Sequence, residues 1–187
     1  MKPSYLICLI ALSLSLLSAC VQSSHSTHDK GETDIIIPDA TAEKLDAKIR
    51  DILENANDFE LVTTEPHGKR PQDEGTKDDP RLYGYRILGR AKVSSKEQAR
   101  LVNELYQGIA ANKGEVAACF DPRHALVAKK GEDRVELVIC FECLSMNVFL
   151  NGKRQEGVLT EGFPKKVFNE VAAKHKLKVD PGWHNNN

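Results

Sequence analysis

Three cysteines and one histidine lie close together between residues 119 and 143. They are Cys119, His124, Cys140 and Cys143. Thiols and imidazoles at such spacing can form a disulfide, bind zinc or carry out thiol chemistry. The order C-x4-H and then C-x2-C supplies four zinc-type ligands, while C-x2-C alone also occurs in thiol oxidoreductases. The choice among these chemistries depends on the elements that hold the four side chains.

The four residues fall in two strand-like runs, and a Lys-Gly-Glu-Asp turn signal at 130–133 predicts that the runs form a hairpin. If residue 129 pairs with residue 133, Cys119 lies directly opposite Cys143. Opposed β-carbons in an antiparallel pair are roughly 5 Å apart, close enough for a disulfide. The register therefore predicts a Cys119–Cys143 disulfide that joins the two strands.

The same register argues against a bond within C-x2-C. On one continuous strand, thiols three residues apart point to opposite faces, with α-carbons about 10 Å apart. A Cys140–Cys143 bond would require the strand to break into a turn, and the flanking residues contain neither Gly nor Pro. Zinc bound by Cys119, His124, Cys140 and Cys143 is the alternative to the disulfide.

This pairing leaves Cys140 as an odd thiol on the same face as His124. An adjacent imidazole favours the thiolate, so Cys140 is a candidate functional thiol with His124 and Arg123 beside it. A buried cysteine next to a hydrogen-bonded histidine is the other interpretation. No third orienting group can be named from the sequence, so we assign no catalytic residue.

The N-terminus has the features of a targeting segment. Lys2 precedes an apolar run, residues 6–17, that is too short to span a bilayer comfortably. The run ends in Leu17-Ser18-Ala19-Cys20, which resembles the lipobox of bacterial lipoproteins. The resemblance implies removal of residues 1–19 and lipidation of Cys20. Val21, where an Asp would resemble an inner-membrane retention signal, favours the outer membrane.

Composition divides the rest of the chain. Residues 20–37 contain the predicted lipidated cysteine and a polar tether, residues 38–180 form a single domain, and residues 181–187 form a disordered tail. Within the domain, the charged, Pro- and Gly-containing segment 66–81 is predicted to be an exposed loop. The 26 Lys and Arg against 27 Asp and Glu give a net charge of −1, which argues against a nucleic-acid partner.

Hydrophobic periodicity predicts three amphipathic helices and four strand-like runs. The helices are expected at about 41–56, from 95 to 114 and from Pro164 onward, and the strands at 59–64, 82–93, 116–129 and 134–150. Short turns join neighbouring strands more readily than helices do. We therefore predict an α+β fold, a four- to five-stranded mainly antiparallel sheet with about three helices packed on it.

The hairpin also resembles a group of uncharacterised bacterial exported proteins. The resemblance rests on C-F-x-P-R-H at 119–124 and I-C-F-x-C at 139–143. It implies export or lipid anchoring and brings no known activity. No Gly-rich phosphate loop, G-x-S-x-G elbow or H-E-x-x-H motif occurs in the sequence.

We therefore expect a bacterial cell-envelope protein, attached to the membrane by its N-terminal lipid and facing the periplasm. The domain is expected to bind or scaffold a protein or small ligand, without a cofactor, rather than to act as an enzyme. The alternative is a small thiol- or zinc-dependent protein that uses Cys119, His124, Cys140 and Cys143.

Overall fold

The computed structural model describes residues 34–66 and 78–181. The predicted signal peptide, Cys20, most of the tether, the centre of the 66–81 loop and nearly all of the predicted tail lie outside the described residues. Within the described part of the chain, no helix is both long enough and apolar enough to cross a membrane.

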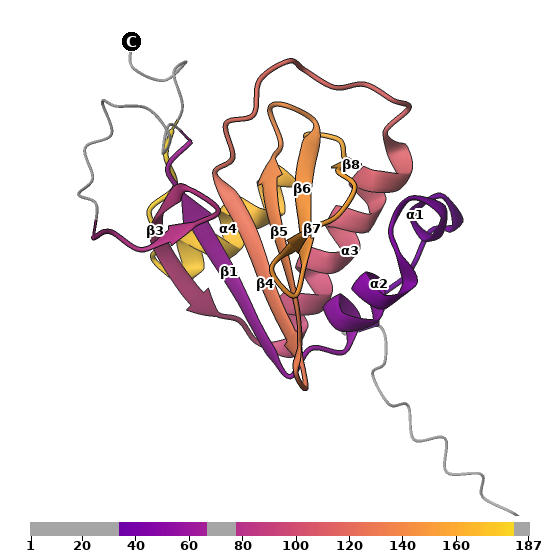
Figure 1. Ribbon diagram of the computed structural model, residues 1–187, viewed down its shortest axis with the longest axis horizontal. Helices are drawn as coiled ribbons and strands as arrows, with labels where there is room; N and C mark the ends of the chain where they lie inside the picture. Colours follow the sequence, from indigo (N-terminus) through magenta and orange to yellow (C-terminus); the bar gives the residue numbers. More distant parts are fainter. Residues whose placement is uncertain (1–33, 67–77, 182–187) are drawn as a thin grey trace, which may run out of the picture.

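Along the described chain, two helices are followed by three strands, a third helix, five strands and a last helix (Figure 1). The helices are α1 (Asp39–Lys44), α2 (Ala47–Glu54), α3 (Ser95–Ala111) and α4 (Lys165–Lys174). The strands are β1 (Asp58–Thr64), β2 (Arg81–Leu82), β3 (Tyr85–Lys92), β4 (His124–Lys130), β5 (Asp133–Cys140), β6 (Ser145–Leu150), β7 (Lys153–Arg154) and β8 (Val158–Leu159).

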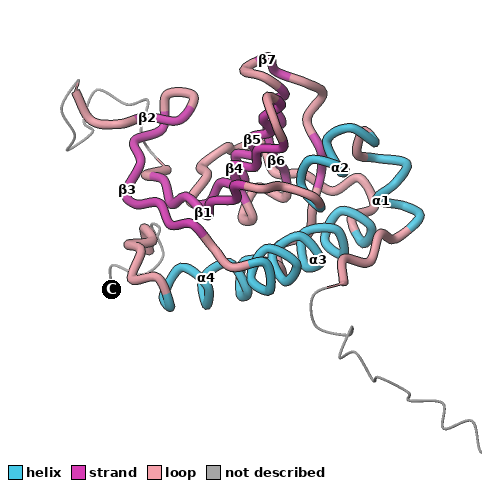
Figure 2. Tube along the Cα trace, turned by 90° about the horizontal axis from the view of Figure 1, so that it is seen from below, coloured by secondary structure: helices cyan, strands magenta, loops and turns pink. Residues whose placement is uncertain are grey.

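The strands form one antiparallel sheet in the order β2-β3-β1-β4-β5-β6-β7, and β8 pairs with β6. Helices α3 and α4 lie along one face of this sheet (Figure 2). The α+β class is thus confirmed, but the sheet has eight strands rather than four or five. Strands β2, β7 and β8 have two residues each, too few for a periodic pattern to reveal.

Both faces of the central strands are buried. Leu61, Leu126 and Leu137 belong to the main core beneath the helices, whereas Val62, Ala125 and Val138 belong to a smaller core on the opposite face. The smaller core is completed by Leu82, Tyr85 and Phe149. Burial on both sides explains why β4 and β5 read as nearly continuous apolar runs instead of alternating ones.

The first predicted helix differs from the structure, whereas α3 begins at Ser95, as predicted. The first predicted helix divides at Leu45 and Asp46, and the Asp46 side chain caps α2 by accepting from the amides of Lys48 and Ile49. The N-cap of α3 is Ser94, which forms a capping box with Glu97.

The domain begins earlier than residue 38. Ile35 and Ile37, which the sequence placed in the tether, pack against the main core. The Ile36 amide also donates to Asn103 Oδ1 of α3 at 2.7 Å. The last residues before α1 are therefore part of the domain.

Candidate functional site

The sequence predicted one strand from 134 to 150, but the structure has two strands there, β5 and β6. Strand β5 ends at Cys140 in a tight turn, and β6 returns from Ser145, which pairs with Cys140. The Cys143 amide donates to the Cys140 carbonyl at 3.2 Å, and Leu144 has a φ of 56°. Left-handed backbone usually requires Gly or Asn, so a leucine gave no sign of this turn in the sequence.

The turn changes the cysteine pairing. It brings the α-carbons of Cys140 and Cys143 to 5.1 Å, and these two residues form a disulfide. The predicted Cys119–Cys143 bond is therefore corrected. The β4–β5 register pairs Lys129 with Arg134 rather than Asp133, and β4 begins only at His124, so Cys119 precedes the strand.

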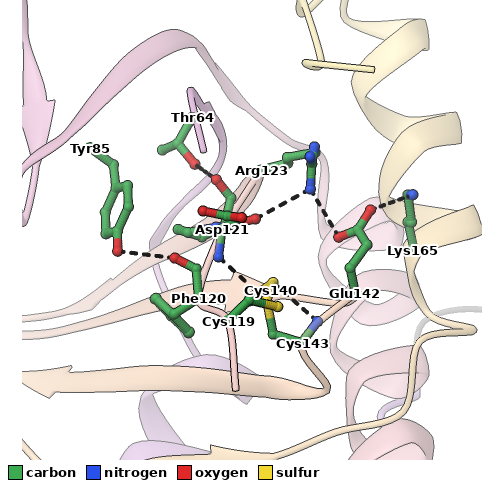
Figure 3. Close-up of a disulfide and its surroundings, with 11 residues drawn as sticks. Thr64, Tyr85, Cys119, Phe120, Asp121, Arg123, Cys140, Glu142, Cys143 and Lys165 are labelled. Carbon is green, nitrogen blue, oxygen red and sulfur yellow. Dashed lines mark hydrogen bonds and ion pairs between the residues drawn. A yellow bond between two sulfur atoms is a disulfide. The ribbon is translucent and has the colours of Figure 1, made fainter. Parts of the chain in front are cut away.

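Cys119 nevertheless lies against the disulfide. Its Sγ is 2.8 Å from Cys143 Sγ, and all three sulfur atoms lie within 4.8 Å of one another (Figure 3). We call Cys119, Cys140 and Cys143 the cysteine cluster. Cys119 is free and exposed, whereas Cys140 and Cys143 are both 0% exposed. The free thiol is thus Cys119, whereas the sequence suggested Cys140.

Backbone amides hold the cluster in place. The Cys143 amide lies 3.1 Å from Cys140 Sγ, and the Asp121 amide donates to Cys143 Sγ at 3.4 Å. The Ala117 amide donates to the Cys143 carbonyl at 3.1 Å, which fixes the segment before Cys119 beside the turn. Amide donors close to sulfur favour its negatively charged form.

Charged side chains surround the turn. Glu142, inside C-x2-C, pairs with Arg123 at 3.2 Å and with Lys165 at the start of α4 at 2.5 Å (Figure 3). Burial alone would raise the pKa of Glu142, but the Lys165 hydrogen bond and the Arg123 charge outweigh it and lower that pKa. Arg123, whose side chain is 6% exposed, also lies 3.6 Å from Asp180. The sequence pointed to Arg123 but not to Glu142 and Lys165, because no local motif links these two residues to the cysteines.

His124 is separate from the cluster. It pairs with Ile139 across the β4–β5 ladder, so Cys140, the next residue, points to the other face of the sheet. Its ring contacts Phe141 and Phe168, and its Nε2 lies 2.9 Å from Asn169 Oδ1. The predicted shared face of Cys140 and His124 is therefore wrong, because the true register is shifted by one residue.

The burial of His124 has an electrostatic consequence. Desolvation lowers its pKa from 6.5 to about 4, against the opposing effect of the Asn169 hydrogen bond. The imidazole is neutral at pH 7. Among the described residues, the side chains whose ligand atoms meet are the three cysteines, without His124. The predicted four-ligand zinc set is thus not assembled around one point.

A groove on the described part of the chain lies away from the cluster. It has a volume of about 1140 Å³ and is lined by the α1–α2 segment, residues 112–114 and residues 155–159, together with Val148 and Leu150. None of the cysteines lines it. The cysteine cluster thus lies outside this groove, and its exposed member is Cys119.

Comparisons of the chain with protein-family models, with curated proteins and with solved structures find no match.

Proposed function

We propose that this chain is a lipid-anchored bacterial cell-envelope protein whose domain carries out thiol–disulfide exchange at the cysteine cluster. The N-terminal sequence Leu17-Ser18-Ala19-Cys20 supports the anchor. One observation carries the exchange activity, namely the exposed free thiol of Cys119 placed 2.8 Å from a sulfur of a buried disulfide. The sequence favoured a binding or scaffolding domain, and this contact favours the thiol alternative instead.

The exchange step needs no outside oxidant or reductant. Cys119 loses its proton to solvent, and the thiolate attacks Cys143 Sγ. A Cys119–Cys143 bond forms, the Cys140–Cys143 bond breaks, and Cys140 leaves as a thiolate that takes up a proton. The Cys143 amide, 3.1 Å from Cys140 Sγ, stabilises this leaving thiolate.

Exposure determines how a partner would use the site. Because Cys140 and Cys143 are buried, a partner thiolate reaches the disulfide only after it has moved to Cys119. The partner then attacks Cys119 Sγ and releases Cys143 as a thiolate, and a second partner thiol resolves the mixed disulfide. The partner dithiol becomes a disulfide, and Cys140 and Cys143 become thiols. A protein dithiol is the substrate class that fits this step.

Reduction kinetics test the exchange activity. The assay uses the full chain with Cys8→Ser and Cys20→Ser, so that the only cysteines are those of the cluster. The protein is treated with dithiothreitol and quenched with an alkylating agent, and mass spectrometry counts the alkylated cysteines. We expect Cys119→Ser to slow reduction of the Cys140–Cys143 bond at least tenfold, since the route through the exposed sulfur is lost. Ala118→Ser, a neighbouring exposed change, is the control and should reduce at the original rate. Equal or faster reduction of Cys119→Ser would refute the exchange activity.

Fractionation tests the anchor separately. Cys20→Ser should move the protein from the membrane to the soluble fraction, because the thiol that accepts the lipid is gone. Cys8→Ser, in the apolar run of the leader, should leave membrane attachment unchanged. A Cys20→Ser protein that stays with the membrane would contradict the lipid anchor.

A further inference from the structure

Reduction of the Cys140–Cys143 bond by a dithiol, which itself becomes a disulfide, would leave three thiols at one place in the fold, and these release their protons to solvent when they bind a metal ion as thiolates. Their sulfur atoms already lie within 4.8 Å of one another. We propose that the reduced cysteine cluster binds one Cu(I) ion through three thiolates. This site does not rest on the exchange activity, because it requires only that all three cysteines are reduced and not that they exchange with a partner.

The spacing fits a metal–thiolate centre. A metal–sulfur distance of about 2.3 Å places three sulfurs about 4 Å apart around a trigonal ion. The α-carbons of Cys140 and Cys143 are 5.1 Å apart, so rotation of the side chains is enough to reach that spacing once the bond is broken. The Ala117 amide bond to the Cys143 carbonyl keeps the segment that carries Cys119 beside the turn.

The donor set selects the metal. Three thiolates form a soft site, and thiolates favour Cu(I) and zinc among biological metals. Structural zinc sites are almost always four-coordinate, and the expected fourth ligand, His124, is held by Asn169 on the other face of the sheet. Cu(I) is satisfied by three sulfurs, so the cluster suits Cu(I) better than zinc.

Backbone amides next to the sulfurs favour the thiolate forms. Amides of Cys143 and Asp121 lie 3.1 and 3.4 Å from the sulfurs of Cys140 and Cys143. The Arg123 guanidinium, almost fully buried, lies next to the turn and contacts the Asp121 carbonyl at 3.3 Å. Such outer contacts orient thiolate ligands and tune the bound ion. Cys119, the exposed member, provides the route by which the ion reaches the two buried sulfurs.

A competition titration tests the site. The full chain with Cys8→Ser and Cys20→Ser is reduced, freed of reductant under nitrogen, and titrated with Cu(I) against a chromophoric Cu(I) chelator. We expect one ion per chain by native mass spectrometry, and no binding to the oxidised protein. Cys119→Ser and Cys140→Ser should each weaken binding at least a hundredfold. Ala118→Ser and His124→Gln should change it less than threefold.

Three results would overturn the proposal. They are a reduced protein that does not hold Cu(I) against the chelator, an unchanged affinity in Cys119→Ser, and zinc bound more tightly than Cu(I) with a dependence on His124. Cys119 is exposed, so its serine variant should keep the fold, which circular dichroism checks. The titration uses fully reduced protein, so its outcome is independent of the reduction rates that test the exchange activity.

Discussion

The burial of His124 makes the stability of the domain depend on pH. His124 is 1% exposed and its ring packs against those of Phe141 and Phe168, where protonation would place a charge among aromatic rings. Desolvation is the largest cause of its lowered pKa. The Asn169 hydrogen bond and the Glu142 charge act in the opposite direction, while Lys165 and Arg123 reinforce the lowering.

The sign and size of the effect follow from the shift. The pKa falls from 6.5 in the unfolded chain to about 4 in the folded one, so the unfolded state takes up the proton first on acidification. The stabilisation is present above pH 6.5 and is lost as the pH falls to about 4. One pKa unit corresponds to about 1.4 kcal/mol, so acidification from pH 7 to pH 5 should cost about 2 kcal/mol at this residue.

Urea unfolding at pH 7 and pH 5 measures this cost. His124→Gln cannot titrate but keeps an amide that can pair with Asn169, so the drop in its free energy of unfolding should be smaller than the wild-type drop by about 2 kcal/mol. Carboxylates titrate alike in the two proteins and cancel in the comparison. Equal drops in the two proteins would refute the reasoning, as would an NMR titration that finds the His124 pKa near 6.5.

Substitutions at three further positions test the packing, the helix cap and the charges of the domain. Gly108→Ala in α3 would put a β-carbon 2.5 Å from Thr160 Oγ1, and should lower the melting temperature through a loss of about 1–3 kcal/mol; an unchanged melting temperature would contradict the packing. Ser94→Ala removes the α3 cap and should cost about 1 kcal/mol in urea unfolding, whereas Ser94→Gly should cost less. Lys165→Met should raise the pKa of Glu142, which NMR can follow. The free energy of unfolding should change by less than about 1 kcal/mol, since both side chains are 39% exposed. A Glu142 pKa that stays the same would contradict the assigned pairing.

Several elements were predictable because their causes are local. Apolar spacing in α3 and α4 produces one buried stripe on each helix, and the Lys-Gly-Glu-Asp signal gives the β4–β5 turn, where Gly131 has a φ of 61°. Strand β1 was predicted within one residue of its start. Periodicity and turn chemistry act over a few residues, so a single sequence contains them.

The cysteine pairing depended on one turn that carries no local signal. Leu144 adopts a left-handed backbone with no Gly or Pro nearby, and the β5–β6 and β6–β8 ladders hold it there. Without that turn, Cys140 and Cys143 point to opposite faces of a strand. A shift of one residue in the β4–β5 register likewise moved His124 away from Cys140.

The sequence by itself determined the α+β class, the main helices, the β4–β5 hairpin and the three cysteines of the proposed site. Tertiary structure alone decided which of them meet. The contacts of Glu142 with Lys165, and of His124 with Asn169, join a β-hairpin to a helix more than twenty residues further along the chain. Such contacts depend on how the sheet and α4 pack together, and no sequence motif around either partner identifies the other.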